Sequence, residues 1–398
     1  MTLPDPAPAN GPLSRPIIAG IVTALVGVTS SFAVVLTGLA AVGASSAQAA
    51  SGLLVLCVTM GVASIILAWR TRMPVTVAWS TPGAAVLAAS GGVDGGWSAA
   101  VGAFLVTAAL ILLTALWPQL GRLIARIPPS IAQAMLAGVL LPLCLAPIGG
   151  LMQTPWAVAP VLATWLLAVR FAPRWAVPLA FVAAASVIGI DIALTDAAVA
   201  SSSLVPRVEF TAPSLTVGSV LGLALPLFLV TMASQNVPGV AIMRSYGYHV
   251  PWRPAMLVTG LGTALGAPAG GHAINLAAIS AALAAAPDAD PDPRRRWVAG
   301  VSTGVTAIAL GGLSAVLTAL LLVAPAGVVP AVAGVALLAA FGSAVQQAVD
   351  EPGERLPAVV TLLVAASGVQ AAGIGAAFWA LAAGLLVRGV LRLGATPR

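Results

Sequence analysis

Long apolar stretches separated by short polar connections run through most of this chain. In the first half the stretches are Ile17–Val42, Gly52–Trp69, Trp97–Trp117, Ile131–Leu145, Trp156–Phe171 and Trp175–Leu194. In the second half they are Ser214–Ser234, Pro254–Leu265, Trp297–Val323, Val328–Val349, Pro357–Val369 and Gly373–Val390. A helix of about 20 apolar residues crosses the hydrocarbon core of a bilayer, so the pattern predicts a membrane protein with many spans.

Two further segments interrupt this pattern with proline, glycine and polar residues: Pro74–Gly83 and Ala267–Leu276. Each is predicted to begin as a short extended piece and to turn into a helix. Thr81 followed by Pro82 predicts an N-cap and a first helical residue, and Asn275 is the candidate cap of the second helix. Broken backbone at membrane depth is tolerated only where protein buries it or where it lines a cavity. A pair of such breaks points to the substrate site of a transporter.

With the broken segments, which run to about Ser90 and Ala286, each half contains seven elements. The polar connection Thr195–Pro213 lies at the midpoint of the chain and joins the halves. An odd number of crossings per half puts the two halves in opposite orientations. The predicted fold is an all-α polytopic membrane protein with 14 transmembrane elements in two inverted repeats of seven, residues 16–200 and 201–398. Elements 3 and 10 are half-helices preceded by short extended segments, and residues 1–15 form a disordered cytoplasmic tail.

The arginines predict the orientation in the membrane. All 17 basic residues are arginine, and an amino terminus in the cytoplasm puts every one except Arg207 on the cytoplasmic side. This distribution follows the positive-inside rule and places both termini in the cytoplasm. The expected location is a bacterial-type inner membrane. A composition of 60% hydrophobic and 7% charged residues excludes a soluble domain, and the absence of a basic soluble face excludes nucleic-acid binding.

Charged groups are missing from the predicted membrane interior. No acidic residue lies well inside a span, and His272, in the second break, is the one ionisable candidate there. Half-helices that enter from opposite faces would point their N-termini at each other, each with about half a positive charge. A site of this kind favours an anion, with Ser80, Thr81, His272 and Asn275 as neutral donors.

Two polar clusters, Thr29–Phe32 and Ser234–Gly239, occupy matching positions in the first span of each half. Because Gln235 and Asn236 are costly against lipid, we expect them to lie against the broken segments. For both residues, substrate contact and simple helix association stay open. Ser30 and Ser31 equally allow close helix packing.

His272 also has two open roles, as a proton carrier with an ordinary pKa of about 6.5 or as a donor to a freed carbonyl. The acidic run Asp288–Asp292 is predicted to be a solvated loop rather than a calcium site, since prolines break it and arginines follow. We expect no metal and no cofactor.

Two motifs, Ala233-Ser-Gln-Asn-Val-Pro-Gly239 and Gly270-Gly-His-Ala-Ile-Asn-Leu-Ala-Ala278, resemble those of the benzoate:proton symporter (BenE) family. The resemblance extends from about Pro16 to the carboxy terminus. It implies the seven-plus-seven fold of nucleobase and sulfate transporters, with a core domain of about 16–117 and 214–323 that moves against a gate domain of about 130–194 and 328–392. The binding residues that it implies are Ser30, Ser31, Phe32, Ser80, Thr81, Gln235, Asn236, His272 and Asn275.

One departure concerns the nucleobase transporters, which carry glutamates on elements eight and ten. This chain has Gln235, Asn236 and His272 in those regions, which argues against nucleobase recognition and carboxylate-based proton coupling.

The expected function is import of benzoate or a related aromatic carboxylate with protons, by an elevator-like alternating-access mechanism. The carboxylate would lie at the helix N-termini and the ring near Phe32 and Phe341, and either His272 or the substrate would carry the proton. An inorganic anion or nucleobase carrier of the same fold and a passive anion channel are the alternatives. An enzyme is not expected, because one intramembrane histidine supplies no acid/base pair. A homodimer within the bilayer is a further option.

Overall fold

The computed structural model describes residues 13–117, 128–195, 204–278, 280–372 and 374–393, and its fold is mostly helical. Eight helices in these ranges are long and apolar enough to cross a membrane. They are Ser14–Ala41, Ser46–Thr71, Gly96–Leu116, Pro129–Gln153, Pro173–Thr195, Val217–Ser245, Val328–Val349 and Ala376–Leu393. The chain is therefore a polytopic membrane protein.

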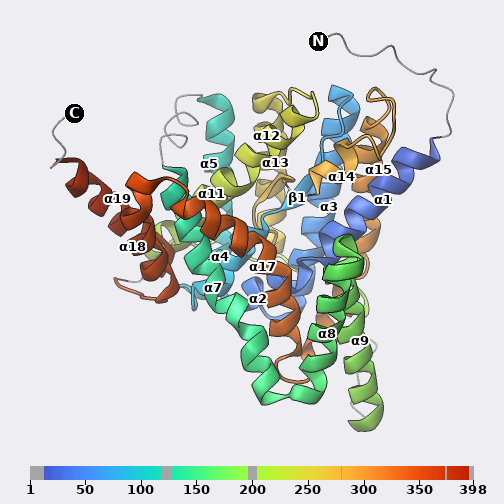
Figure 1. Ribbon diagram of the computed structural model, residues 1–398, viewed down its shortest axis with the longest axis horizontal. Coiled ribbons are helices and arrows are strands. Elements are labelled where there is room, and N and C mark those ends of the chain that lie inside the picture. Colours follow the sequence, from blue (N-terminus) through green and yellow to red (C-terminus); the bar gives the residue numbers. More distant parts are fainter. Residues whose placement is uncertain (1–12, 118–127, 196–203, 279, 373, 394–398) are drawn as a thin grey trace.

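In the first half of the chain, the helices are interrupted between α1 and α2 and again by the strand β1 with the short helix α4 (Figure 1). Its elements are α1 (Ser14–Thr29), α2 (Phe32–Ala41), α3 (Ser46–Thr71), β1 (Val77–Trp79), α4 (Thr81–Ala89), α5 (Gly96–Leu116), α7 (Pro129–Gln153), α8 (Pro155–Phe171), η1 (Pro173–Trp175) and α9 (Ala176–Thr195). The first predicted span thus divides into α1 and α2 at Ser30 and Ser31, within the polar cluster Thr29–Phe32.

The second half of the chain contains more and shorter elements than the first. Its elements are α10 (Val217–Ser219), η3 (Val220–Ala224), α11 (Leu225–Thr231), η4 (Met232–Asn236), α12 (Val237–Ser245), α13 (Trp252–Gly266), η5 (Ala267–Ala269), β2 (Ile274–Leu276), α14 (Ala281–Ala285), α15 (Trp297–Gly311), α16 (Ser314–Leu322), α17 (Val328–Val349), η6 (Pro352–Glu354), α18 (Arg355–Ala366) and α19 (Ala376–Leu393). The predicted span Trp297–Val323 is bent by 50° between α15 and α16.

The helices pack in two groups. In one group α3 contacts α13, α15 and α16, α1 packs on α15, and α5 packs on α13. In the other, α7 contacts α17 and α18, α18 contacts α19, and α8 contacts α9. Small residues allow close crossings within the groups, as at Gly61 of α3 and Gly304 of α15.

The two broken segments meet in the middle of the fold. β1 pairs antiparallel with β2, with Val77 opposite Leu276 and Trp79 opposite Ile274. The pairing continues beyond the strands, since Ser80 N donates to the carbonyl of Ala273 at 2.9 Å and Ala277 N to that of Thr76 at 2.9 Å. Each extended segment therefore supplies hydrogen-bond partners to the other, as backbone away from water requires.

Side chains from neighbouring helices satisfy the outer edges of this small sheet. The hydroxyl of Ser64, on α3, accepts a hydrogen bond from Val77 N at 2.8 Å. The hydroxyl of Thr263, on α13, accepts one from Ile274 N at 3.1 Å. Each strand is thus tied to the helix that precedes it in its own half of the chain.

The half-helices begin at different residues from those predicted. Ser80, rather than Thr81, is the N-cap of α4, and its hydroxyl accepts a hydrogen bond from Gly83 N at 3.1 Å. Asn275 caps no helix, because it lies inside β2. The helix α14 starts only at Ala281, spans five residues and has Ser280 at its N-cap without a side-chain hydrogen bond. Continued strand pairing after Asn275 delays the start of this helix.

Two other predictions need correction. Helix α1 already begins at Ser14, so the predicted tail 1–15 is too long, and residues 1–12 lie outside the described residues. The acidic loop is not fully solvated, since Asp290 is 3% exposed and Arg296 is 6% exposed. The Arg296 guanidinium donates to the carbonyls of Ala285 at 2.9 Å and Asp290 at 2.7 Å, which fixes the loop onto the end of α14.

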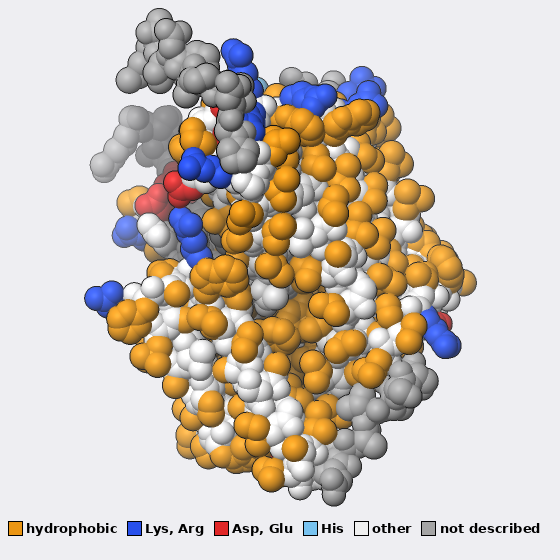
Figure 2. Space-filling model, turned by 90° about the vertical axis from the view of Figure 1, so that its right-hand side faces the viewer, with side chains coloured by type: hydrophobic (Ala, Val, Ile, Leu, Met, Phe, Trp, Pro, Cys, Tyr) orange, Lys and Arg blue, Asp and Glu red, His pale blue; other side chains and the backbone are white. Residues whose placement is uncertain are grey.

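The outer surface is apolar. Figure 2 shows hydrophobic side chains over most of the visible face, with arginines mainly towards its upper end. Large exposed side chains include Ile148, Leu166, Phe171, Ile190 and Leu386. Such a surface is stable in lipid and would aggregate in water.

The Gly61–Gly304 crossing gives a stability test. A Cβ added at Gly61 would lie 2.6 Å from the carbonyl oxygen of Gly304, so Gly61→Ala should destabilise the protein by about 1–3 kcal/mol. Gly149→Ala in α7 is the matched control, because no atom lies within 4 Å of that Cβ position. Thermal unfolding in detergent should show a lower melting temperature for Gly61→Ala alone. Equal melting temperatures would contradict the close crossing.

Candidate functional site

A cavity of about 360 Å³ lies between the two helix groups, beside the starts of both half-helices. Its first wall is formed by Val26, Gly27, Ser30, Ser31, Ala78, Trp79, Thr81, Pro82, Gln235, Ala277, Ala278, Ser280 and Leu283. Its second wall is formed by Leu140, Pro173, Arg174, Val177, Pro178, Ala336, Leu337, Ala339 and Ala340. The volume falls in the range of about 300–1,000 Å³ that is typical of small-molecule sites.

The two walls differ in chemistry. The first wall carries the hydroxyls of Ser30, Ser31, Thr81 and Ser280 and the amide of Gln235. The second wall is apolar except for Arg174, and no acidic side chain lines the cavity within the described ranges. The arrangement suits a molecule with a polar or anionic head and an apolar body.

The start of α4 brings one residue to the cavity as a free donor. The N–H of Gly83 is used by the Ser80 hydroxyl, and that of Ala84 by the Ser80 carbonyl at 2.8 Å. Pro82 has no N–H. Within the described part of the chain, the N–H and hydroxyl of Thr81 have no partner, so Thr81 is the donor that this helix start offers to an anion.

Ser80 itself lies behind the cavity wall and is fully buried. Its hydroxyl accepts a hydrogen bond from Thr231 Oγ1 at 2.8 Å, which joins the start of α4 to α11. Ser80 and Thr231 therefore support the position of Thr81 rather than line the cavity. Thr231 sits in an apolar run of the sequence, where no local signal marks it.

Gln235 and Asn236 are neighbours with different environments. Both belong to the π-helical turn η4, and such turns are frequent at functional sites. Gln235 lines the cavity, and its amide has no partner among the described residues. Asn236 is fully buried, and its Oδ1 accepts a hydrogen bond from Leu276 N at 2.9 Å. Asn236 thus completes the pairing of β2, while Gln235 is available to a ligand.

Ser31 connects the break between α1 and α2 to the first strand. Its hydroxyl accepts a hydrogen bond from Trp79 Nε1 at 2.9 Å, and both residues line the cavity. The Ser30 hydroxyl donates to the Gly27 carbonyl at 3.0 Å. Phe32 is 1% exposed and packs edge-on against Phe181, with ring centroids 4.7 Å apart. Trp79, rather than Phe32, presents an aromatic surface to the cavity.

His272 and Asn275 are fully buried and do not line the cavity. Both ring nitrogens of His272 lack a hydrogen-bond partner among the residues that the structure describes, and its ring lies edge-on to Phe104 at a centroid distance of 6.4 Å. Asn275 Nδ2 donates to the Leu276 carbonyl at 2.8 Å, while its Oδ1 has no partner in the described ranges. Unpaired polar atoms of this kind are rare inside proteins and commonly mark a function or a bound water.

Of the nine residues predicted for the site, the cavity therefore brings together Ser30, Ser31, Thr81 and Gln235. Phe32, Ser80, Asn236, His272 and Asn275 are buried outside its lining. Sequence reasoning missed Trp79, Ser280 and Arg174. The first two follow from their places in or after the predicted breaks, whereas nothing in the sequence joins Arg174 to them.

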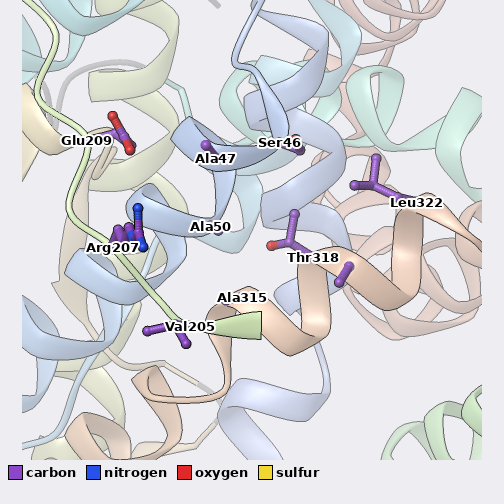
Figure 3. A pocket seen from close by; sticks show the side chains of 10 residues that line it. Ser46, Ala47, Ala50, Val205, Arg207, Glu209, Ala315, Thr318 and Leu322 are labelled. Atoms are coloured by element: carbon purple, nitrogen blue, oxygen red, sulfur yellow. The ribbon is translucent and has the colours of Figure 1, made fainter. Parts of the chain in front are cut away.

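A second cavity, of about 220 Å³, lies beside the start of α3 and α16 (Figure 3). Arg207 and Glu209 extend from the stretch that passes over it. No residue of this cavity belongs to the predicted site, and neither charged side chain forms an ion pair with the described residues. We therefore take the first cavity as the candidate site.

Comparison with known sequences agrees with the resemblance carried by the two motifs. The sequence model described as "Benzoate membrane transport protein" matches residues 12–390. The chain is 38% identical over 381 residues to the inner membrane protein YdcO of Escherichia coli, covering 95% of this chain and 96% of that protein. It is 31% identical over 334 residues to the benzoate membrane transport protein of Acinetobacter baylyi, covering 83% of each.

Solved structures are similar in fold. The transmembrane domain of the cyanobacterial bicarbonate transporter BicA is 16% identical, with a TM-score of 0.57, and the match covers 96% of this chain and 97% of that domain. Murine Slc26a9, an anion transporter in the inward-facing state, is 13% identical, with a TM-score of 0.58 and coverage of 98% and 70%. At these identities the likeness concerns the fold alone.

The contrast between Asn236 and Gln235 is testable. Asn236→Ala should lower the free energy of unfolding by about 1–3 kcal/mol, because Leu276 N is left buried without an acceptor. Gln235→Ala, one residue earlier, removes an amide that contacts only the cavity and should leave the melting temperature within about 1 °C of wild type. Thermal unfolding of the ligand-free protein would show this, and a reversed order of the two variants would contradict the assignment.

Proposed function

This chain belongs to the benzoate membrane transport family, and on that premise we propose that it imports benzoate or a related aromatic carboxylate together with a proton. The observation that carries the proposal is the two-sided cavity. Its first wall offers neutral donors at a helix start, and its second wall is apolar. A flat aromatic acid matches both walls, because it carries an anionic carboxylate at one end and an apolar ring at the other.

In the proposed complex, the carboxylate accepts hydrogen bonds from the N–H and hydroxyl of Thr81 and from the Gln235 amide. The dipole of α4, which begins at Thr81, stabilises the negative charge. The ring packs against Trp79 and the aliphatic side chains of the second wall, including Val177 and Leu337. A small inorganic anion would leave this apolar wall without a partner, which favours an aromatic acid over the inorganic alternative.

The proposal includes 14 transmembrane elements in two inverted repeats, 16–200 and 201–398. Several paired features support it. The first span of each half departs from regular α-helix near its polar cluster, at Ser30–Ser31 and at the π-helical turn η4. It places a strand and a short helix third in each half, and the two strands pair antiparallel. The equivalent ties from Ser64 and Thr263 to these strands follow the same repeat.

The proposed mechanism moves a core domain, about 16–117 and 214–323, against a gate domain, about 130–194 and 328–392. Every residue of the first wall falls in the core ranges, and every residue of the second wall falls in the gate ranges. A substrate in the cavity would therefore lie between the two bodies, as an elevator-like movement requires. Such a carrier accumulates its substrate against a gradient, unlike a passive channel.

The proposed orientation has both termini in the cytoplasm of a bacterial cell and the protein in the inner membrane. The arginine distribution supports it, as does the similarity to the inner membrane protein YdcO of Escherichia coli. The cavity then opens beside Arg174 towards the cytoplasm. At the other face, Gln370 Nε2 donates to the Ser90 carbonyl and joins the proposed gate to the core.

Proton coupling follows from the cost of moving charge. Import of an anion against an inside-negative potential costs about 2.3 kcal/mol per charge per 100 mV, and one proton removes this cost. His272 is the proposed proton carrier because it lies two residues before β2 and neither of its ring nitrogens has a partner in the described part of the chain. The alternative is that the acid crosses with its own proton.

The transport proposal is tested by uptake of radiolabelled benzoate into proteoliposomes. An inward proton gradient should raise the initial rate and drive accumulation above equilibrium, because proton entry offsets the charge of the substrate. A protonophore should abolish the accumulation. An uptake rate that is independent of the proton gradient would contradict symport. Displacement of bound benzoate by sulfate or uracil, and not by benzoate analogues, would favour the inorganic anion or nucleobase carrier.

The role of His272 is tested by comparison with His249, which is exposed in the connection between α12 and α13. His272→Ala should reduce proton-driven accumulation by about tenfold, equivalent to about 1.4 kcal/mol, while His249→Ala keeps it. Counterflow of benzoate between loaded liposomes needs no net proton movement and should persist in His272→Ala. Similar mild effects of the two substitutions would assign His272 a structural role.

A further inference from the structure

The candidate cavity contains one charged side chain among its described lining residues, that of Arg174. Arg174 stands in the single turn η1 between α8 and α9, next to the lining residues Pro173 and Val177 of the second wall. The donors Thr81 and Gln235 lie on the opposite wall. A positive charge therefore borders a cavity that holds no negative one.

The backbone of Arg174 is fixed, but its side chain is free to move. Trp175 N donates to the Ala172 carbonyl at 2.8 Å, which closes the turn, and Pro173 restricts it further. The Arg174 side chain is 67% exposed, and its one polar contact with the described residues is from Nη2 to Asp288 Oδ2 at 3.5 Å. Because Asp288 is 80% exposed, this pair is weak and can open readily.

Asp288, which contacts Arg174, lies in the loop that follows α14, the helix that contributes Leu283 to the first wall. Hydrogen bonds fix the conformation of this loop. Arg296 holds it through the carbonyls of Ala285, Asp290 and Pro291, and Asp290 Oδ1 accepts a hydrogen bond from Asp292 N at 2.9 Å. The carboxylate of Asp288 is thus kept beside Arg174, the charged residue of the cavity lining.

We propose that Arg174 is a substrate-recruiting residue, which draws the carboxylate of an organic acid to the cavity, and that Asp288 is its partner in the empty state. An entering carboxylate replaces Asp288 on the guanidinium before it reaches Thr81. Guanidinium groups bind carboxylates through two parallel donors, so the exchange keeps the charge of Arg174 paired. This inference rests on the proposed function, since it takes an organic carboxylate as the substrate.

The two charges should have opposite effects on affinity. Removal of the Arg174 charge removes the attraction, whereas removal of the Asp288 charge removes a competitor. Because both groups are exposed, salt screens them, and their effects should shrink as ionic strength rises. A merely structural ion pair would instead give the same loss for either substitution.

The test measures equilibrium binding of radiolabelled benzoate to the purified full-length protein at about 50 mM and about 500 mM salt. Arg174→Gln should weaken binding by about fivefold to tenfold at low salt and by less at high salt. Arg174→Lys should keep most of the affinity, and Asp288→Asn should bind more tightly than wild type. Arg170→Gln is the matched control, because Arg170 lies in the last turn of α8, four residues earlier, and does not line the cavity.

Three results would overturn the proposal. Binding by Arg174→Gln equal to that by Arg170→Gln would remove the recruiting role, and a loss in Asp288→Asn equal to that in Arg174→Gln would make the pair structural. Absence of any benzoate binding by wild type would instead overturn the proposed function, and this inference with it. If Arg174→Gln fails to fold, as judged by its melting temperature, the recruiting role is tested instead by the salt dependence of benzoate binding to wild type and to Asp288→Asn. A wild-type affinity unaffected by salt would contradict recruitment.

Discussion

Two stretches of extended backbone, Val77–Trp79 and Ile274–Leu276, pair with each other almost two hundred residues apart in the chain, and the architecture of the centre depends on this pairing. Extended backbone cannot satisfy its own hydrogen bonds, and lipid offers none. The strands solve the problem together, helped by the hydroxyls of Ser64 and Thr263 and by Asn236 Oδ1. Polar side chains in this region are therefore partly structural, which limits the number that can serve a ligand.

The same pairing determines which residues reach the cavity. Where β1 ends, Ser80 uses its hydroxyl and carbonyl on the first turn of α4, and Thr81 is left with free donors. The second half-helix contributes less than the first, because α14 has five residues and begins well after β2. The anion-binding character of the cavity thus comes mainly from α4 and Gln235, set against the apolar side chains of α7, α9 and α17.

Much of the fold was predictable from the sequence, and the reasons are local. Apolar length located the eight described helices that are long enough to cross a membrane, and proline, glycine and polar residues located the two extended segments. The cap of α4 was misplaced by one residue because Ser80 and Thr81 are both good caps, and only the end of the strand pairing selects between them. The side chain of Asn275 could not be placed, because strand register decides the face on which a residue points, and that of His272 could not because it precedes β2 in irregular backbone. Arg174 was missed because its approach to the cavity is a tertiary contact between distant segments.

The central claim is that an aromatic carboxylate binds between the donors of the first wall and the apolar second wall. A crystal structure of the protein with 4-iodobenzoate tests it most directly, since the anomalous signal of iodine locates the ring. We predict an iodine peak beside Leu337 and Val177, with the carboxylate about 2.7–3.2 Å from the Thr81 donors. An iodine peak elsewhere, for example in the cavity beside Arg207, would contradict the account.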